Sequence, residues 1–396
     1  MQDAVIVDAV RVPVGRRGGA LAGIHPVDLL GHTLRGLVDR VGIDPAQVDD
    51  VIAGCVDQVG EQAVNVARNA WLAAGLPETV PATTVDRQCG SSQQAAHFAA
   101  QGVIAGAYDV AIACGVESMT RVPMLSNVAG ADPFGPQLHA RYDGRLVPQG
   151  IAAELVGARW AVTREAADAI ALESHRRAHA AAAAGAFAAE ILPVKVTTED
   201  GSVAELTADE GVRPDTSAAK LAGLAPAFVD EGMAATFPEI RWTVTAGNAS
   251  PIADGAAALL VMSGATAAEL GLTPRWRFRT FALAATDAVT MLTGPIPATR
   301  RALERAGMTV ADIDHFEVNE AFATVVAAWQ HELRADPARV NPRGGAIALG
   351  HPLGASGARL MTTMLHALEQ TGGRFGLQAM CEGGGLANAT ILERLG

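Results

Sequence analysis

The sequence GIDPAQVDDV at residues 42–51 decides the fold class, because it recurs in altered form as GMTVADIDHF at residues 307–316. In both places the segment joins a helical pattern to a strand pattern. Two further pairs of segments repeat at nearly the same spacing, residues 89–92 with 353–356 and residues 110–115 with 377–382. Three pairs of similar segments at nearly one spacing indicate an internal duplication. Two copies favour paired α/β domains over a solenoid, which needs more units to bury its faces.

The two copies are separated by a different kind of sequence. Strand patterns within the copies, such as residues 110–113, are apolar throughout, as expected for strands covered by helices on both faces. Residues 119–252 instead hold an alanine-rich helical pattern and long polar stretches. Long insertions on a rigid scaffold commonly carry substrate contacts. We therefore predict an N-terminal α/β domain of residues 1–118 with 253–272, an inserted loop domain of residues 119–252, and a C-terminal α/β domain of residues 273–396.

Composition restricts the classes of function. The chain has 396 residues, is 49% hydrophobic and carries a formal net charge of −12. That charge disfavours nucleic acid and anionic membrane surfaces as partners, so an anionic ligand would have to meet a local basic patch. The four cysteines are scattered, which favours free thiols over zinc ligands. No secretory signal and no apolar run near ~18 residues is present, which predicts a cytoplasmic protein.

Cys89 is the first candidate for chemistry. It follows a strand pattern that ends near Val85 and precedes the helical pattern of residues 92–98. A thiol at a helix N-terminus is stabilised as the thiolate by the free amides and the helix dipole. A small buried cysteine at a tight turn explains the residue about as well.

His351 lies in the glycine-rich segment GGAIALGHPLG, residues 344–354. The flanking Gly350 and Pro352 give a rigid context, and a neutral imidazole near Cys89 could remove its proton. A single histidine is more often structural. The segment does not fit a dinucleotide-binding motif, because its glycine spacing differs and no acidic ribose partner follows.

Two further residues complete the candidate set. Cys381 precedes Gly383, Gly384 and Gly385, whose exposed amides could form an oxyanion hole, and a second thiol suits the acid and base steps of Claisen chemistry. Asn319 follows the strand pattern of residues 315–318, and α/β sheets build their sites at strand ends. Asparagine at such a junction is by itself usually a helix cap.

Together these motifs resemble the thiolase family from end to end. They are DRQCGSSQQ at residues 86–94, NEAF at 319–322, GGAIALGHPLG at 344–354 and CEGGG at 381–385. Their wording is similar to that of degradative actinobacterial thiolases, some of which serve fatty-acid or steroid-derived acyl-CoA breakdown.

The resemblance implies a role for each matching residue. Cys89 is the nucleophile that takes an acyl group from a thioester, and His351 activates it and later donates to the thioester oxygen. Cys381 is the base or acid at the α-carbon. Asn319 holds a water that, with His351, stabilises the enolate oxygen. The amides of Cys89 and Gly383 hold the oxyanion of the acyl-enzyme.

Contacts to coenzyme A are less clear in the sequence. The segment TAGNAS at residues 245–250 matches the family's pantetheine channel and implicates Ser250, although ordinary turn chemistry explains that segment nearly as well. Gln149 stands where short-chain biosynthetic relatives carry the methionine of a His-Met pair bordering the acyl pocket. Extra residues occur at 237–242. The acyl-chain preference is therefore open.

The phosphate contacts are open as well. Ala225 stands where many relatives place a basic residue near the coenzyme's phosphates. Arg213, Lys220 and Arg241 are candidates to replace it.

The resemblance predicts a thiolase fold, with two duplicated α/β domains in a layered αβαβα core and a loop domain over coenzyme A. It implies 3-ketoacyl-CoA thiolase or acetyl-CoA acetyltransferase activity through an acyl-cysteine, in fatty-acid β-oxidation. Acyl-CoA, acetyl-CoA and coenzyme A are the expected partners, with no tightly bound cofactor or metal, in a homodimer or homotetramer.

Three alternatives remain. One is a short-chain enzyme that forms acetoacetyl-CoA. A decarboxylating ketoacyl synthase would use one cysteine with two histidines, or with a histidine and an asparagine, so Cys381 argues against it. A non-catalytic acyl-CoA-binding protein would be expected to lack one of the four catalytic side chains.

Overall fold

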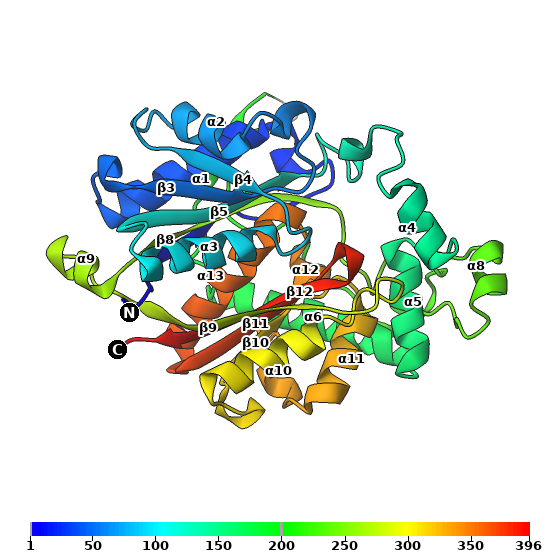
Figure 1. Ribbon diagram of the computed structural model, residues 1–396. Helices are drawn as coiled ribbons and strands as arrows, with labels where there is room; N and C mark the ends of the chain where they lie inside the picture. Colours follow the sequence, from blue (N-terminus) through cyan, green and yellow to red (C-terminus); the bar gives the residue numbers. More distant parts are fainter. Residues whose placement is uncertain (1, 199–200) are drawn as a thin grey trace.

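The computed structural model describes residues 2–198 and 201–396 and consists of helices and strands in alternating layers (Figure 1). The strands are β1 (Val5–Arg11), β2 (Gly15–Arg16), β3 (Asp50–Gly54), β4 (Ala82–Val85), β5 (Val110–Ser118), β6 (Val194–Thr197), β7 (Val203–Leu206), β8 (Ala253–Met262), β9 (Trp276–Ala285), β10 (His315–Val318), β11 (Phe375–Glu382) and β12 (Leu386–Arg394). The helices are α1 (Pro26–Val41), α2 (Val66–Ala73), α3 (Ser91–Ala105), α4 (Gly135–Tyr142), α5 (Gln149–Arg159), α6 (Arg164–Ala183), α7 (Ala218–Ala222), α8 (Glu231–Thr236), α9 (Gly264–Glu269), α10 (Pro295–Ala306), α11 (Ala323–Leu333), α12 (Ala346–Leu349) and α13 (Leu353–Thr371).

The duplication is visible in the order of elements. In each half a helix (α1 or α10) leads to a short parallel strand (β3 or β10), and a central helix lies beside a long strand (α3 with β5, α13 with β11). The repeated segments begin with the glycines that end the helices. Gly42 and Gly307 cap α1 and α10 with φ of 74° and 66°, a left-handed conformation that glycine adopts without steric cost. The predicted α/β fold with duplicated halves is confirmed.

The two halves share one continuous sheet, which the sequence did not reveal. Its strand order is β10-β11-β12-β9-β1-β8-β5-β3-β4, with β2 paired to β8. Strands β3–β4, β3–β5 and β10–β11 pair in parallel. The halves join where β1 pairs antiparallel with the start of β9, with Val5 opposite Arg277 and Ile6 opposite Trp276.

Helices α3 and α13 lie between the two halves of the sheet, whereas α1 with α2 and α10 with α11 cover the outer faces (Figure 1). Small residues allow this central layer to pack closely. A Cβ at Gly115 would lie 2.7 Å from Ser92 Cβ, and one at Gly357 would lie 2.8 Å from Gln93 Cβ. The Ser92 hydroxyl accepts a hydrogen bond of 2.8 Å from the Ala358 amide, so the helices are also joined by a buried polar contact.

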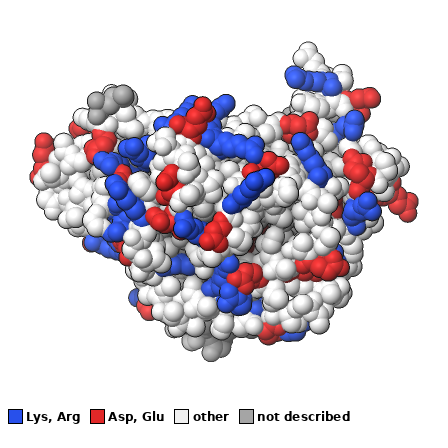
Figure 2. Space-filling model, turned by 90° about the horizontal axis from the view of Figure 1, so that it is seen from below, with Lys and Arg blue, Asp and Glu red and all other residues white. Residues whose placement is uncertain are grey.

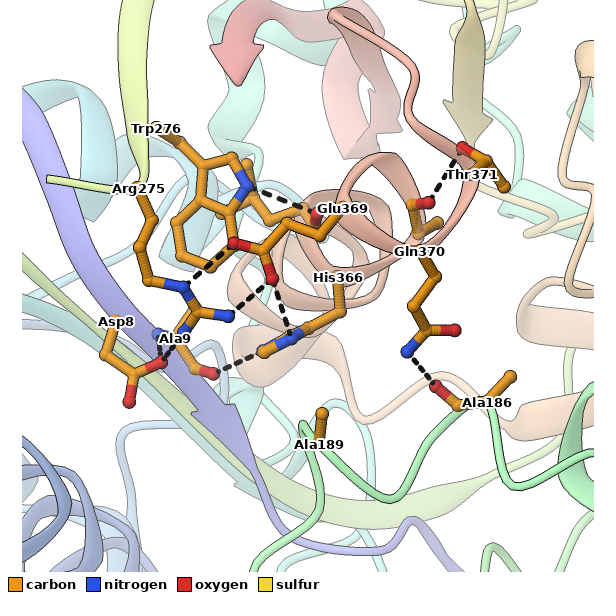
Figure 3. Close-up of polar contacts among 12 residues, drawn as sticks. Asp8, Ala9, Ala186, Ala189, Arg275, Trp276, His366, Glu369, Gln370 and Thr371 are labelled. Carbon is orange, nitrogen blue, oxygen red and sulfur yellow. Dashed lines mark hydrogen bonds and ion pairs between the residues drawn. The ribbon is translucent and has the colours of Figure 1, made fainter. Parts of the chain in front are cut away.

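A charged cluster fixes α13 against the first strand (Figure 3). Arg275 donates to Asp8 Oδ1 at 2.5 Å and to Glu369 at 2.5 and 2.9 Å. His366, which is buried, bonds to the Ala9 carbonyl oxygen through Nε2 at 2.9 Å. Because each charge has an opposite partner, the burial of these groups is compensated.

Residues 119–252 contain α4 to α8 and the hairpin β6–β7. Helices α4, α5 and α8 lie to one side of the layered core, whereas α6 packs against α12 (Figure 1). Helix α4 projects from the body in Figure 1 and exposes Phe134, just before its start. Basic and acidic side chains are interspersed on the face seen in Figure 2. Among the described residues, no helix is long and apolar enough to cross a membrane.

Candidate active site

The Cys89 thiol lies at the start of the central helix α3. The turn before it is strained, because Gln88 has φ of 49°, which is uncommon for a residue other than glycine and is often found at functional sites. Cys89 is 4% exposed and packs in one buried cluster with Leu353 and Met380. These two residues are near neighbours of His351 and Cys381 in the chain. The packing therefore brings together the segments that carry the three predicted side chains.

The environment of the Cys89 thiol disfavours its anion. Burial raises the pKa of Cys89, and a negative charge on the nearby Cys381 or Glu382 raises it further. The pKa of Cys381 is raised to about 12, again chiefly by burial. The amides of the first turn of α3 act in the opposite direction. A nucleophilic role for Cys89 therefore requires a base at the site.

His351 has the protonation state of such a base. Its Nδ1 lies 2.6 Å from the Ser356 hydroxyl, which itself donates to the Pro352 carbonyl oxygen at 2.8 Å. Because that hydroxyl proton is already used, Nδ1 carries the hydrogen and Nε2 keeps its lone pair. Burial lowers the pKa of His351 to about 3, and the Arg359 charge contributes in the same direction. The imidazole is therefore neutral at working pH.

Asn319 lies directly against this base. Its Nδ2 donates to His351 Nε2 at 3.3 Å, and its main-chain N–H donates to the Ala379 carbonyl oxygen at 3.0 Å. Its side chain is buried, and within the described ranges no donor reaches Oδ1. It does not cap the following helix, because the residue before α11 is Phe322.

Two buried carboxyl groups that the sequence analysis did not single out support these segments. Glu320 accepts hydrogen bonds from Ser174 Oγ at 2.6 Å, Asn341 Nδ2 at 2.9 Å and Ile347 N at 3.1 Å. It thereby fixes the chain that leads to His351.

Glu117 connects the two halves beside the nucleophile. Its carboxyl group accepts from the amides of Val56 at 2.9 Å, Asp57 at 3.2 Å and Gly354 at 2.8 Å. Gln62 adds a side-chain bond of 2.7 Å. Its signal in the sequence was an acidic residue within an otherwise apolar strand.

We expect Gly354→Ala to distort this junction. A Cβ at Gly354 would lie 2.6 Å from Cys55 Cα and 2.8 Å from the Gly54 carbonyl oxygen, so main-chain atoms would have to move. Overpacking of this kind costs about 1–3 kcal/mol. Thermal and urea unfolding should show that loss, together with reduced activity. Gly23→Ala is the matched control, since nothing lies within 4 Å of the added methyl group, and its effect should stay within about 0.5 kcal/mol. Equal stability of the two variants would contradict the packing argument.

Cys381 and the glycine turn close the other side of the site. Cys381 lies near the end of β11 and is 1% exposed, and Gly383 opens the turn Gly383–Gly385. A Cβ at Gly383 would lie 3.0 Å from Gln88 Oε1 and 3.2 Å from Gln149 Nε2. The structure thus places Gln149, at the start of α5, beside the glycine turn and the residue that precedes the nucleophile.

Ser250 lies on the side of Asn319. Its amide donates to the Ala321 carbonyl oxygen at 2.9 Å, and the preceding Ala249 pairs with Phe322. The segment TAGNAS therefore runs along the NEAF turn. It borders the site without entering the hydrogen bonds of His351.

An apolar cluster borders Cys381. It combines residues of α5, the inserted segment and the loop before α10 with Phe322. Its buried members include Val147, Ile151, Leu155, Phe237, Ile240, Met291, Leu292 and Phe322. Of the extra residues at 237–242, Phe237 and Ile240 are buried members of this cluster and Trp242 packs against it. The insertion thus contributes apolar surface close to the second thiol.

The three candidate cations for phosphate binding are all exposed. Lys220 forms an ion pair with Asp215, and the Arg213 amide donates to His175 Nδ1 at 3.2 Å. These contacts leave open which cations meet the phosphates of coenzyme A. Cys55 and Cys114 are fully buried and lie in the core of the N-terminal half. Within residues 2–198 and 201–396, no group of three or more His, Cys, Asp or Glu side chains could hold a metal ion.

The duplicated α/β halves hold a buried thiol on a strained turn, a neutral histidine and a second buried thiol between them. These are the groups that acyl transfer through a cysteine requires. Comparison with family models gives a match to the thiolase N-terminal domain over residues 4–265 and to the thiolase C-terminal domain over residues 272–394. The chain belongs to the thiolase family, as the motifs predicted.

Individual relatives agree with this assignment. A steroid 3-ketoacyl-CoA thiolase of Mycobacterium tuberculosis is 52% identical over 403 residues, with 100% of this chain and 95% of that protein covered. A 3-ketoacyl-CoA thiolase of Pectobacterium carotovorum is 44% identical, with both chains covered completely. Among solved structures, the acetyl-CoA acetyltransferase of Bacillus anthracis matches with a TM-score of 0.88 at 38% identity, over 100% of this chain and 99% of that one.

Proposed function

We propose that this protein is a degradative 3-ketoacyl-CoA thiolase that cleaves its substrate with coenzyme A through an acyl-Cys89 intermediate. The observation that carries the proposal is the buried cluster that joins Cys89 to the neighbours of His351 and Cys381, with the imidazole held neutral. A neutral imidazole beside a thiol of raised pKa is the arrangement that general-base activation requires.

In the first half-reaction, His351 Nε2 takes the proton of Cys89 and the thiolate attacks the 3-keto carbon. The oxyanion is held by the amides of Cys89 and Gly383. Cleavage of the bond between carbons 2 and 3 leaves the acyl group on Cys89 and releases the enolate of acetyl-CoA. Cys381 donates its proton to that enolate, whose oxygen is stabilised by His351 and by a water held on Asn319. Each donor to such an oxyanion is worth about 3 kcal/mol.

In the second half-reaction, the Cys381 thiolate takes the proton of the coenzyme A thiol, and the resulting thiolate attacks the acyl-Cys89 thioester. The carbon–sulfur bond to Cys89 breaks, and the departing Cys89 thiolate takes the proton held by His351. The products are the shortened acyl-CoA and the free enzyme, with Cys89 and Cys381 both in the thiol form. Claisen condensation of acetyl-CoA is the same sequence in reverse.

The substrate is proposed to carry a large apolar acyl group. The cluster beside Cys381 gains Phe237 and Ile240 from the extra segment, and burial of apolar surface favours a larger acyl chain by roughly 25 cal/mol per Å². The mycobacterial relative is named for steroid substrates, which are of this kind. Acetoacetyl-CoA formation, the activity suggested by the name of the Bacillus relative, is the alternative.

A graded series of 3-ketoacyl-CoAs, from acetoacetyl to long and ring-bearing chains, tests the proposal through loss of the enolate absorbance in the presence of coenzyme A. We expect kcat/KM to rise with the size of the acyl group by at least tenfold. Cleavage of acetoacetyl-CoA alone would establish the short-chain alternative. No cleavage of any member would favour a binding protein.

Other properties of the family are proposed for this chain on the same basis. Ser250 and Gln149 contact the pantetheine arm of coenzyme A, and residues 119–252 cover the coenzyme. The N-terminal domain comprises residues 1–118 with 253–272, and the C-terminal domain residues 273–396. The protein acts in the cytoplasm as a homodimer or homotetramer, in lipid breakdown.

A further inference from the structure

A carboxyl group that the proposed mechanism does not use lies directly beneath the nucleophile turn. Glu382 follows Cys381 on β11, and the alternation of side chains along a strand sends the two to opposite faces. Glu382 is fully buried. The carboxyl group is therefore close to the site yet not part of its surface.

The contact between Glu382 and the nucleophile turn is tight. A Cβ at Gly90, the residue after Cys89, would lie 2.8 Å from the Glu382 carboxyl carbon and would collide with Glu382 Oε1 and Asn388 Oδ1. Only glycine fits there, and both side chains reach the same point beneath the turn. Asn388 comes from β12, where it pairs with Met380 of β11.

Among the described residues, neither side chain has a hydrogen-bond partner on a third residue, although the main-chain amide of Asn388 lies near the Glu382 carboxyl group. Within the described ranges, both carboxyl oxygens of Glu382 and both polar atoms of the Asn388 amide are buried without a hydrogen bond. Leaving four buried polar atoms in adjacent groups without partners would cost their full desolvation penalty. Glu382 Oε1 and Asn388 Oδ1 both reach the same point beneath Gly90, so these two oxygens are close neighbours. A protonated Glu382 can donate its proton to Asn388 Oδ1, which accepts it. A carboxylate has no proton to donate and would leave Asn388 Oδ1 without a partner.

We propose that Glu382 is a positioning residue that stays protonated, donates its proton to Asn388 Oδ1, and supports the Cys89–Gly90 turn without placing a negative charge beneath the two thiols. The inference deepens the proposed function, since it rests on Cys89 being the reactive thiol. The property in question is whether the Glu382 carboxyl group carries a proton.

The electrostatic surroundings are consistent with this arrangement. Burial raises the pKa of Glu382 to about 9. The ionisable groups around it are Asp86 and Arg87 in the nucleophile turn, the two thiols of Cys89 and Cys381, and His97 on the same face of α3 as Gly90. His97 is neutral, because burial lowers its pKa to about 3. Arg87 is the cation that favours the Glu382 anion, and it is outweighed by the burial.

The sign of the pH effect follows directly. Near neutral pH, well below its pKa of about 9, Glu382 is uncharged and does not oppose the Cys89 thiolate. As the pH rises through 9, the new carboxylate raises the pKa of Cys89 and Cys381, as the charge interaction of Glu382 with both thiols requires. A shift of one unit in the thiol pKa lowers the thiolate fraction about tenfold.

The test measures alkylation of Cys89 by iodoacetamide from pH 7 to 10, read by mass spectrometry of the peptide that contains Cys89. It compares the native protein with Glu382→Gln, which mimics the neutral acid. We expect the two rates to agree within about twofold at pH 7 and to diverge to about tenfold at pH 10, with the variant faster. Glu393→Gln, a carboxyl group of β12 that is paired with Arg277 and Arg374, is the matched control and should follow the native curve.

Two results would overturn the proposal. A variant already many times faster at pH 7 would mean that Glu382 is charged at neutral pH. Equal rates up to pH 10 would mean that Glu382 does not act on the thiol. The infrared spectrum supplies a readout that does not depend on an intact active site. Compared with the native protein, Glu382→Gln should lack one band of a protonated carboxyl group, and Glu393→Gln should lack none. Alkylation uses no substrate. If the protein cleaved none of the 3-ketoacyl-CoAs, the proposed function would be wrong, but the alkylation test of Glu382 would still be decided by its own result.

Discussion

Cys89→Ala is expected to lower the rate of 3-ketoacyl-CoA cleavage by at least ~10⁴-fold, the scale of loss seen when a catalytic nucleophile is removed. The change deletes one sulfur from a buried site, so the fold should be retained with a cost of about 1 kcal/mol. Binding of coenzyme A should persist, because the proposed coenzyme contacts lie on other segments. Steady-state kinetics and calorimetric titration with coenzyme A measure the two effects separately.

Cys114→Ala is the matched control. Cys114 is equally buried but lies in β5, and its thiol is near the Ile52 carbonyl oxygen at 3.6 Å. Its replacement should leave kcat within about threefold of the native value at a similar cost in stability. A rate in Cys89→Ala comparable to that of Cys114→Ala would remove Cys89 from the role of nucleophile.

His351→Ala is expected to lower kcat by about 10³-fold, because both the base for Cys89 and a donor to the enolate oxygen are lost. Ser356→Ala should have a smaller effect of about tenfold, since it removes only the acceptor that keeps the hydrogen on Nδ1. The two variants thus separate the imidazole itself from its orientation.

The pH dependence provides a second check on His351. Its pKa is lowered to about 3 in the folded protein, so protonation of the free base does not occur as the pH falls through 6.5. The rate of single-turnover acylation should therefore show no His351 titration between pH 5 and 8. A loss of acylation centred near pH 6.5 that disappears in His351→Ala would contradict a neutral buried imidazole.

The layered fold could be predicted because similar segments recur at several positions of the sequence and reveal the duplication. Gly42 and Gly307 end equivalent helices, and each is followed by a short strand, β3 or β10, at the end of the repeated segment. Such local signals depend on neighbouring residues only. The four motifs likewise identified the family, since each joins a reactive side chain to the glycines that its turn requires.

The parts that could not be predicted depend on contacts between distant segments. Pairing of β1 with β9 joins residues 5–6 to 276–277, and no pattern in either strand specifies that partner. Glu117 binds Gly354 across the two halves, and Glu382 meets Asn388 beneath Gly90. In the sequence each is only an acidic residue in an apolar strand.

The account as a whole depends on acyl transfer to Cys89. The most direct measurement is to mix the protein with a 3-ketoacyl-CoA without added coenzyme A, quench the reaction with acid, digest it and analyse all four cysteine-containing peptides by mass spectrometry. We predict that the peptide with Cys89 alone gains the mass of the shortened acyl group, and that coenzyme A removes it. Acylation of another residue, or no covalent adduct while cleavage proceeds, would contradict the account.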